Sequence, residues 1–145
     1  MKSEERAATD DIPSTSELVD VLQQTVGLVR AHFAAATAQL GVTPVQAKAL
    51  RQLTEPITVK DLSTRLGADV SNTATTVDRL ESQSLIRKDP HPTDRRARIV
   101  TLTDEGRRVL AKLEESAFSN VPALAALNPQ QRRDLYTLLK RAISA

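Results

Sequence analysis

The 145-residue chain has no cysteine, and its single methionine is Met1. Without a thiol it cannot form a disulfide, bind a metal through thiolate sulfur or sense peroxide with a cysteine. Its two histidines, His32 and His91, are a thin basis for a transition-metal site. We therefore expect no metal and no cofactor.

Features of enzymes and membrane proteins are also missing. The four glycines form no phosphate-binding loop, and no nucleophile with a neighbouring base can be identified, so an enzyme is the least supported class. No apolar run approaches the roughly 20 residues that span a bilayer, and the acidic start is unlike a secretory signal. We expect a cytoplasmic protein with no membrane partner.

Aromatic residues make up only 2% of a chain that is 40% hydrophobic, so the core must consist mainly of Leu, Val, Ile and Ala. This composition is typical of helical proteins, and the length suits one domain. The net charge of +2 is too small to indicate nucleic acid, but basic residues dominate between residues 87 and 98. Residues 1–13 are polar and without periodicity, which predicts a flexible acidic tail.

A long amphipathic helix is predicted at the start of the folded region. Ser14, three residues before Glu17, is a capping-box pattern, and apolar residues then recur at steps of three and four. The helix should end near Leu40, with Gly41 as a left-handed cap. Its alanine-rich second half permits close approach of another helix, either within the chain or from a second subunit.

The C-terminal part predicts two more helices. One is capped by Thr103, extends towards Phe118 and is broken or kinked by Pro122 at about Asn120. The other starts at Asn128 and carries an apolar stripe of Leu135, Leu138, Leu139 and Ile143. Because a stripe on a terminal helix must be buried, and long helices stand at both ends, we predict a homodimer.

The centre of the chain has the pattern of a helix-turn-helix. A helix capped at Thr43 is stopped by Pro56, and Thr58 then caps a short helix that ends at Gly67. Asp69 caps a further helix that ends near Ser84.

A ribbon with a basic tip should follow these helices. Extended segments at 85–88 and 99–102 flank a loop, Asp89 to Arg98, that contains two prolines and three arginines. The preceding β-branched pair Ile57–Thr58 suits a minimal third strand. Such a wing can place arginines in the minor groove of DNA while the second helix lies in the major groove.

The second helix carries short polar side chains on one side. Val77 and Leu80 should point into the core, and the outward residues are Ser71, Asn72, Thr75 and Arg79. Asn can bond adenine with both amide atoms, and Arg can bond guanine or phosphate. Ser and Asn near a helix start are also ordinary caps, so the interpretation as base contacts depends on the wing.

Asp94, Arg95 and Arg96 give the wing its sharpest local signal. A carboxylate directly before two guanidiniums can hold one arginine in an ion pair and leave the other free for DNA. Charges in a loop are usually only a solvated face. Between two strands that follow a helix-turn-helix, contact of Arg95, Arg96 and Arg98 with DNA becomes the favoured interpretation.

Several strings together resemble the MarR family of transcriptional regulators. They are LSTRLG at 62–67, VDRLE at 77–81, LI at 85–86, DPHPTDRR at 89–96 and LTDEG at 102–106. The resemblance implies a winged-helix homodimer whose terminal helices interlock and whose two recognition helices read a pseudo-palindrome. Many such regulators repress genes and are released from DNA by small phenolic or other anionic ligands.

By position, the resemblance implies roles for individual residues. Ser71, Asn72 and Thr75 match the major-groove readers, and Arg95 and Arg96 match the wing arginines. Asp94 matches the acid that orients them, whereas Arg79 touches phosphate or braces the domain. The family pocket between the dimerisation helices and the winged domain has three candidate polar anchors, Arg30, His32 and Tyr136.

Three residues depart from the family pattern. Thr76 stands where leucine is usual, Thr75 where arginine is frequent, and Ser84 where a glycine usually closes the recognition helix. These departures leave the class unchanged but put the target DNA sequence in doubt.

The sequence thus predicts a mainly α protein with a small β-ribbon, arranged as a winged helix-turn-helix (43–106) flanked by dimerisation helices (14–42 and 107–145) within one domain, 14–145. The predicted function is sequence-specific binding of double-stranded DNA as a homodimeric repressor, with a small anionic or phenolic effector. The alternative is a winged-helix adaptor that binds proteins without specific DNA binding.

Overall fold

The computed structural model describes residues 12–145. Its elements are, in chain order, α2 (Thr15–Gln39), α3 (Pro44–Gln52), β1 (Ile57–Thr58), α4 (Val59–Leu66), α5 (Val70–Ser82), β2 (Ile86–Pro90), β3 (Arg98–Leu102), α6 (Asp104–Leu113), the π-helix η1 (Glu114–Phe118), α7 (Pro122–Ala125) and α8 (Pro129–Ile143). The predicted tail falls mostly on residues 1–11, which lie outside the described residues. Within 12–145, no helix combines the length and hydrophobicity needed to cross a bilayer.

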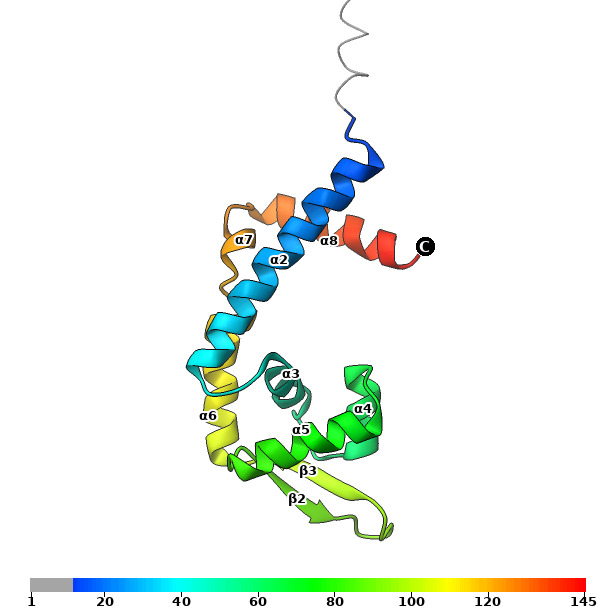
Figure 1. Cartoon of the computed structure of the whole chain (residues 1–145), viewed down its shortest axis with the longest axis vertical. Coiled ribbons are helices and arrows are strands. Elements are labelled where there is room, and N and C mark those ends of the chain that lie inside the picture. The colour runs from blue at the N-terminus through cyan, green and yellow to red at the C-terminus, as the bar shows by residue number, and fades with distance from the viewer. Residues whose placement is uncertain (1–11) are drawn as a thin grey trace, which may run out of the picture.

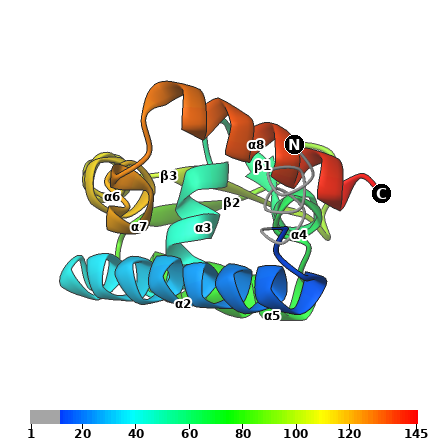
Figure 2. The ribbon, with the colours of Figure 1, turned by 90° about the horizontal axis from the view of Figure 1, so that it is seen from above.

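The elements form a compact body with two arms (Figure 1). The body contains α3, α4, α5 and the sheet, while α2 and α6 lead away from it towards α7 and α8. Seen from above, α2 and α8 run on opposite sides of the molecule (Figure 2), and a side view also shows them apart. α2 packs against η1 and α7.

Side-chain caps begin the helices where the sequence predicts them. Complete capping boxes join Ser14 to Glu17 and Thr43 to Gln46, and a third links Asn128 with Gln131. Gly41 takes the predicted left-handed conformation, with φ of 71°. The capping boxes satisfy backbone N–H groups at the helix starts, whereas the turn at Gly41 satisfies carbonyls at the end of α2.

The helix-turn-helix is formed by α4 and α5. The Thr58 hydroxyl accepts the backbone N–H of Asp61 at 3.1 Å, and Gly67 ends α4 with φ of 61°. Asp69 then caps α5. The sequence placed the end of this helix near Ser84, whereas α5 ends at Ser82 and Ser84 follows with a positive φ of 60°.

The sheet is antiparallel, with strand order β1-β3-β2. Ile57 pairs with Val100, which confirms the minimal third strand, and Ile86 pairs with Leu102. The wing loop is shorter than predicted because β2 extends to Pro90 and β3 already begins at Arg98. β2 is an edge strand, and Pro90 is tolerated there because an edge strand can lack one backbone N–H without breaking the hydrogen bonds between strands.

The core lies between α3, α4, α5, α6 and the sheet. Its fully buried side chains include Leu50, Leu62, Leu80, Val100 and Leu113. At the start of α6, a Cβ on Gly106 would collide with the backbone carbonyl of Leu85. Because residue 106 is glycine, the start of α6 can lie directly against Leu85, the residue before β2. This close contact joins the sheet to the outer helices.

The region after Leu113 differs from its prediction. The helix does extend to Phe118, but its last five residues form the π-helix η1, and Pro122 begins a short helix α7 that the sequence analysis did not foresee. The Asn120 side chain donates to the Glu115 carbonyl at 2.7 Å, and that of Ser119 donates to the Glu114 carbonyl. These bonds to carbonyls five residues back close the widened turn.

Candidate nucleic-acid interface

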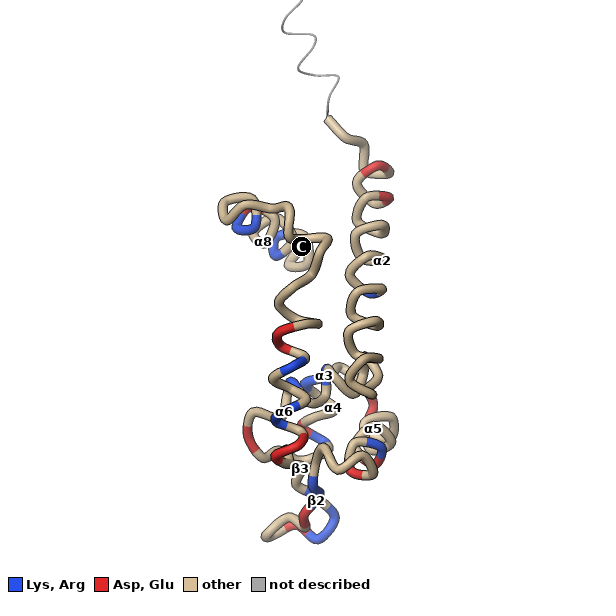
Figure 3. Tube along the Cα trace, turned by 90° about the vertical axis from the view of Figure 1, so that its left-hand side faces the viewer, with Lys and Arg blue, Asp and Glu red and all other residues tan. Residues whose placement is uncertain are grey.

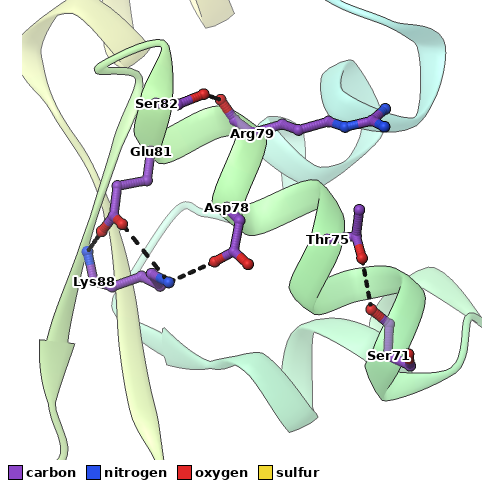
Figure 4. Close-up of polar contacts among 7 residues, drawn as sticks. All are labelled: Ser71, Thr75, Asp78, Arg79, Glu81, Ser82 and Lys88. Atoms are coloured by element: carbon purple, nitrogen blue, oxygen red, sulfur yellow. Dashed lines mark hydrogen bonds and ion pairs between the residues drawn. The ribbon is translucent and has the colours of Figure 1, made fainter.

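The exposed side of α5 carries the predicted base-reading residues. Ser71, Asn72 and Thr75 are all exposed, while Thr73, Val77 and Leu80 are buried on the opposite side. The Thr75 hydroxyl donates to the Ser71 carbonyl at 3.2 Å (Figure 4). The exposed polar side chains therefore belong to a helix whose opposite side packs into the core.

Asn72 is held by the N-cap of its own helix. Its backbone N–H donates to Asp69 Oδ1 at 2.7 Å, and its side-chain amide donates to Asp69 Oδ2 at 2.9 Å. One amide hydrogen and the amide oxygen remain for a partner outside the chain. The Asp69 contact fixes the direction in which Asn72 presents them.

Arg79 lies on α5 about two turns beyond Asn72 and is exposed. Figure 4 shows its side chain directed away from Asp78 and Lys88. Within residues 12–145 its guanidinium takes part in no ion pair, so a nearby phosphate would meet a full positive charge.

A polar cluster that was not predicted from the sequence joins α5 to β2 of the wing. Lys88 Nζ on β2 lies 2.5 Å from Asp78 Oδ1 and 3.6 Å from Glu81 Oε1, and the Lys88 backbone N–H donates to Glu81 Oε2 at 3.2 Å (Figure 4). The hydrogen bond with Asp78 raises the pKa of Lys88. Lys88 lies in the basic stretch 87–98, but its side chain is only 26% exposed and its charge is paired with carboxylates of α5. The signal was present in the spacing of Asp78 and Glu81, which share one face of a helix.

The wing presents three exposed arginines, Arg95, Arg96 and Arg98. Figure 3 shows basic and acidic residues together at the tip of the β2–β3 ribbon. Arg87 on β2 is engaged, since its Nε lies 2.8 Å from Asp89 Oδ2. None of the three wing arginines forms an ion pair with a residue of the described chain.

The expected ion pair between Asp94 and an adjacent arginine is wrong. Asp94 Oδ1 instead accepts the backbone N–H of Arg96 at 2.9 Å, and the Asp94 carbonyl accepts the N–H of Ala97 at 3.2 Å. An aspartate in a tight turn reaches the backbone two residues on more readily than a long neighbouring side chain. Asp94 therefore shapes the loop and leaves both guanidiniums unpaired.

The three predicted ligand anchors are not brought together in the chain. Arg30 lines a cavity of about 690 Å³ between α2, α3, α4 and η1. Tyr136 lines a separate cavity against α8. His32 lines neither; its Nε2 lies 2.8 Å from the Ser116 carbonyl oxygen, which ties α2 to the π-helix.

The larger cavity combines an aromatic wall with several cations. Phe33 and Phe118 pack with ring centroids 5.1 Å apart, and the Arg51 guanidinium stands 4.2 Å above the Phe118 ring. Arg51 Nε also lies 3.2 Å from Glu114 Oε1. The other basic lining residues are Arg30, Lys48 and Arg65. Apart from Arg30, this set was not found from the sequence, because it converges from four separate elements.

Comparisons with known proteins point to one family. The family model for MarR matches residues 42–97. A probable transcriptional regulator from Pseudomonas aeruginosa is 31% identical, with a TM-score of 0.73 over 92% of this chain and 98% of that one. YfiV of Bacillus subtilis, an uncharacterized HTH-type transcriptional regulator, is 29% identical over 72% of this chain and 69% of its own length.

A structure of known DNA-binding geometry shares the fold. A mutant of MarR from E. coli, solved in complex with operator DNA, has a TM-score of 0.75 and 22% identity, covering 86% of this chain and 92% of that one. The family match coincides with the helix-turn-helix and wing, and the structural likeness extends to the flanking helices. The chain belongs to the MarR family of winged helix-turn-helix transcriptional regulators.

Proposed function

We propose that the protein is a repressor that binds a pseudo-palindromic operator as a homodimer. This proposal rests on one observation: α5 has an exposed polar face, and the adjoining wing carries exposed arginines that form no ion pair within the described residues. A helix of this kind reads base edges in the major groove, while wing arginines contact the minor groove and its phosphates. The related MarR structure with operator DNA supports the same use of the fold.

The roles within this interface follow from the geometry. Ser71, Asn72 and Thr75 would read bases, because their side chains are short and lie on the exposed side of the first half of α5. Arg79, Arg95, Arg96 and Arg98 would contact phosphates or the minor groove. Asp94 would contribute by holding the loop, and the winged helix-turn-helix would span residues 43–106.

The dimer would be formed by α2 and α8. Both helices expose large apolar side chains, among them Leu18, Val21, Leu28, Leu138 and Ile143, the last at 77%. Many exposed apolar side chains on a helix indicate an interaction site, and a symmetric pairing lets one subunit's α2 and α8 cover those of the other. The terminal parts 14–42 and 107–145 would then serve dimerisation.

An aromatic anion is the effector that best fits the cavity of about 690 Å³. Its aromatic wall suits a ring, and its cations suit a carboxylate or phenolate. Glu114 holds Arg51 at 3.2 Å, so an entering anion would compete with Glu114 for this arginine. Such competition would alter the contact between α3 and η1. It would thereby change the position of the winged helix-turn-helix relative to the outer helices.

The second candidate is a winged-helix adaptor that binds protein without specific DNA binding. The large exposed apolar residues of α2 and α8 are the observation in its favour. The unpaired arginines favour DNA, because contacts with phosphates release counterions and make affinity fall steeply with salt.

The deciding experiment measures binding to DNA from the protein's own promoter region and to a random duplex of equal length, each at two salt concentrations. The repressor proposal requires tight, salt-sensitive binding that favours the promoter by orders of magnitude. Weak, equal and salt-insensitive binding to both duplexes would instead support the adaptor.

A further inference from the structure

The loop between β2 and β3 is organised around the imidazole of His91. Its Nδ1 lies 3.0 Å from the backbone nitrogen of Asp94 and 3.2 Å from that of Thr93, and both N–H groups donate to it. The Thr93 hydroxyl lies 3.3 Å from the same atom. Only an unprotonated ring nitrogen can accept these bonds, so the neutral ring carries its hydrogen on Nε2.

The contacts of His91 extend to the arginines of the wing. Its backbone N–H donates to the Ala97 carbonyl at 3.3 Å and closes the neck of the loop. Asp94, held by Nδ1, in turn accepts the backbone N–H of Arg96 at 2.9 Å. The positions of Arg95 and Arg96 therefore depend on a chain of hydrogen bonds that begins at one imidazole nitrogen.

The charged groups that face His91 come from three elements. Together they line a cavity of about 580 Å³: Asp94 and Arg96 from the loop, Arg98 from β3, and Lys60 and Asp61 from α4. Three of these groups are cations and two are carboxylates. The two backbone hydrogen bonds at Nδ1 can form only with the neutral ring, because a protonated Nδ1 cannot accept them.

We propose that His91 is a positioning residue for DNA binding, and that protonation of its Nδ1 opens the wing loop and weakens binding. The proposal rests on the proposed function, in which Arg95 and Arg96 contact DNA. Histidine changes charge between about pH 5 and about pH 8, so mild acidification would be the trigger. A protonated Nδ1 would point a hydrogen at two N–H donors, and these bonds would be lost.

Protonation of His91 has two opposing effects on DNA binding, and the direction of the pH dependence shows which one is larger. Protonation also adds a positive charge to the wing, which by itself favours binding to phosphate. Loss of two neutral hydrogen bonds corresponds to roughly a tenfold drop in the population of the closed loop, whereas one exposed charge is screened within about 8 Å at physiological salt. We therefore expect acidification to weaken binding.

The other histidine gives no matching effect. His32 Nε2 donates to the Ser116 carbonyl at 2.8 Å, and a protonated ring makes this bond equally well. Acidification therefore does not remove it.

The test compares the wild type with His91→Asn and His91→Ala in binding to own-promoter DNA at about pH 7.5 and about pH 5.5. The Asn Oδ1 can accept the same two N–H groups but does not titrate. We expect the wild type to lose affinity about tenfold on acidification, His91→Asn to bind tightly at both values, and His91→Ala to bind weakly at both. Tighter wild-type binding at low pH, or a pH profile shared by His91→Asn, would overturn the proposal.

An NMR titration without DNA separates this proposal from the proposed function. The ring-nitrogen shifts of His91 and the amide shifts of Thr93 and Asp94 should change together in the wild type, and the two amides should stay unchanged in His91→Asn. If these signals respond while no DNA is bound at any pH, the loop contact stands and the DNA-binding function fails. If DNA binds but the amides do not respond, the role of His91 fails and the function stands.

Discussion

At the scale of single residues, Ser84 adopts a backbone conformation that suits glycine. Its φ is 60°, and its exposed side chain makes no hydrogen bond in the described structure. A left-handed conformation costs a residue with a Cβ about 1–2 kcal/mol, and glycine avoids this cost. Part of the gain is offset, because glycine raises the conformational entropy of the unfolded chain. We predict that Ser84→Gly stabilises the protein by about 0.5–1 kcal/mol in urea unfolding at fixed protein concentration.

The control is Ser82→Gly, two residues earlier at the last residue of α5, where the serine hydroxyl donates to the Arg79 carbonyl at 2.7 Å. It should destabilise the protein by about 0.5–1 kcal/mol, because glycine weakens a helix where φ is already negative and because the bond to Arg79 is lost. Equal effects of the two substitutions would show that the conformation of Ser84 carries no strain.

Asn72 is the residue whose substitution should change preference among DNA sequences. If its amide bonds a base, Asn72→Ala should cost about 1–3 kcal/mol on the preferred operator and much less on operators altered at that base pair. Asp69 will still cap α5 through the backbone N–H of Asn72, so the fold should persist. Binding titrations on a set of single-base operator variants would measure this, and an equal loss on all of them would assign Asn72 to phosphate contact.

Residue-level prediction succeeded where the interaction is local. The caps at Ser14, Thr43 and Asp69 use partners three residues away, so spacing alone identifies them. Asp94 was placed correctly in the wing but given the wrong partner, because sequence does not show whether the backbone or a side chain reaches a carboxylate first. The partner of Lys88 could not be predicted either, since it lies on another element.

At the scale of elements, the wing can be tested separately from the helix. Replacing both Arg95 and Arg96 by alanine should weaken binding to operator and random DNA together. It should also reduce the slope of log affinity against log salt by about 1 for each lost phosphate contact. Binding at a series of salt concentrations gives both quantities.

The control replaces Arg107 and Arg108, two exposed arginines of α6 that pair with Asp104 and Glu105. This variant loses the same formal charge at a distance from the ribbon tip and should keep its salt slope. If both double variants behave alike, general charge rather than the wing governs binding.

Elements with a strong period or a cap were predictable, and those set by tertiary packing were not. Even the two-residue strand Ile57–Thr58 was found, because β-branched residues stood between two capped helices. The π-helix Glu114–Phe118 was missed since its sequence reads as an ordinary helix. Its widened turn is closed by Asn120 and ends at Phe118, which packs on Arg51 and Phe33 from other elements.

At the scale of the whole molecule, the stripe on α8 should control assembly. Replacing Leu138 and Leu139 by glutamate should convert the proposed dimer to monomer, because these exposed apolar side chains would meet a second copy. Sedimentation measures the mass, and operator affinity should fall with it. Thr137→Glu, on the opposite side of α8, is the control and should remain dimeric. A dimer that survives the double substitution would place the interface elsewhere.

The whole-molecule level was the least accessible to sequence. The apolar stripe on α8 indicated that another surface must cover it. In the structure α8 lies apart from α2, and three of the four stripe residues, Leu138, Leu139 and Ile143, are exposed. The cavity beside Arg51 was out of reach, because its lining residues lie as much as 89 positions apart, from Val29 to Phe118.

The exposed apolar side chains of α2 and α8 would make the number of protein molecules in the cell a variable in gene control. If a second chain covers them, folding and assembly are linked, and the stability of each subunit falls as the protein is diluted. Operator occupancy would then drop by more than half when cellular abundance is halved, because scarce monomers contribute to binding only as pairs. A cell could thus steepen its transcriptional response by adjusting synthesis or turnover of the regulator, with no ligand involved.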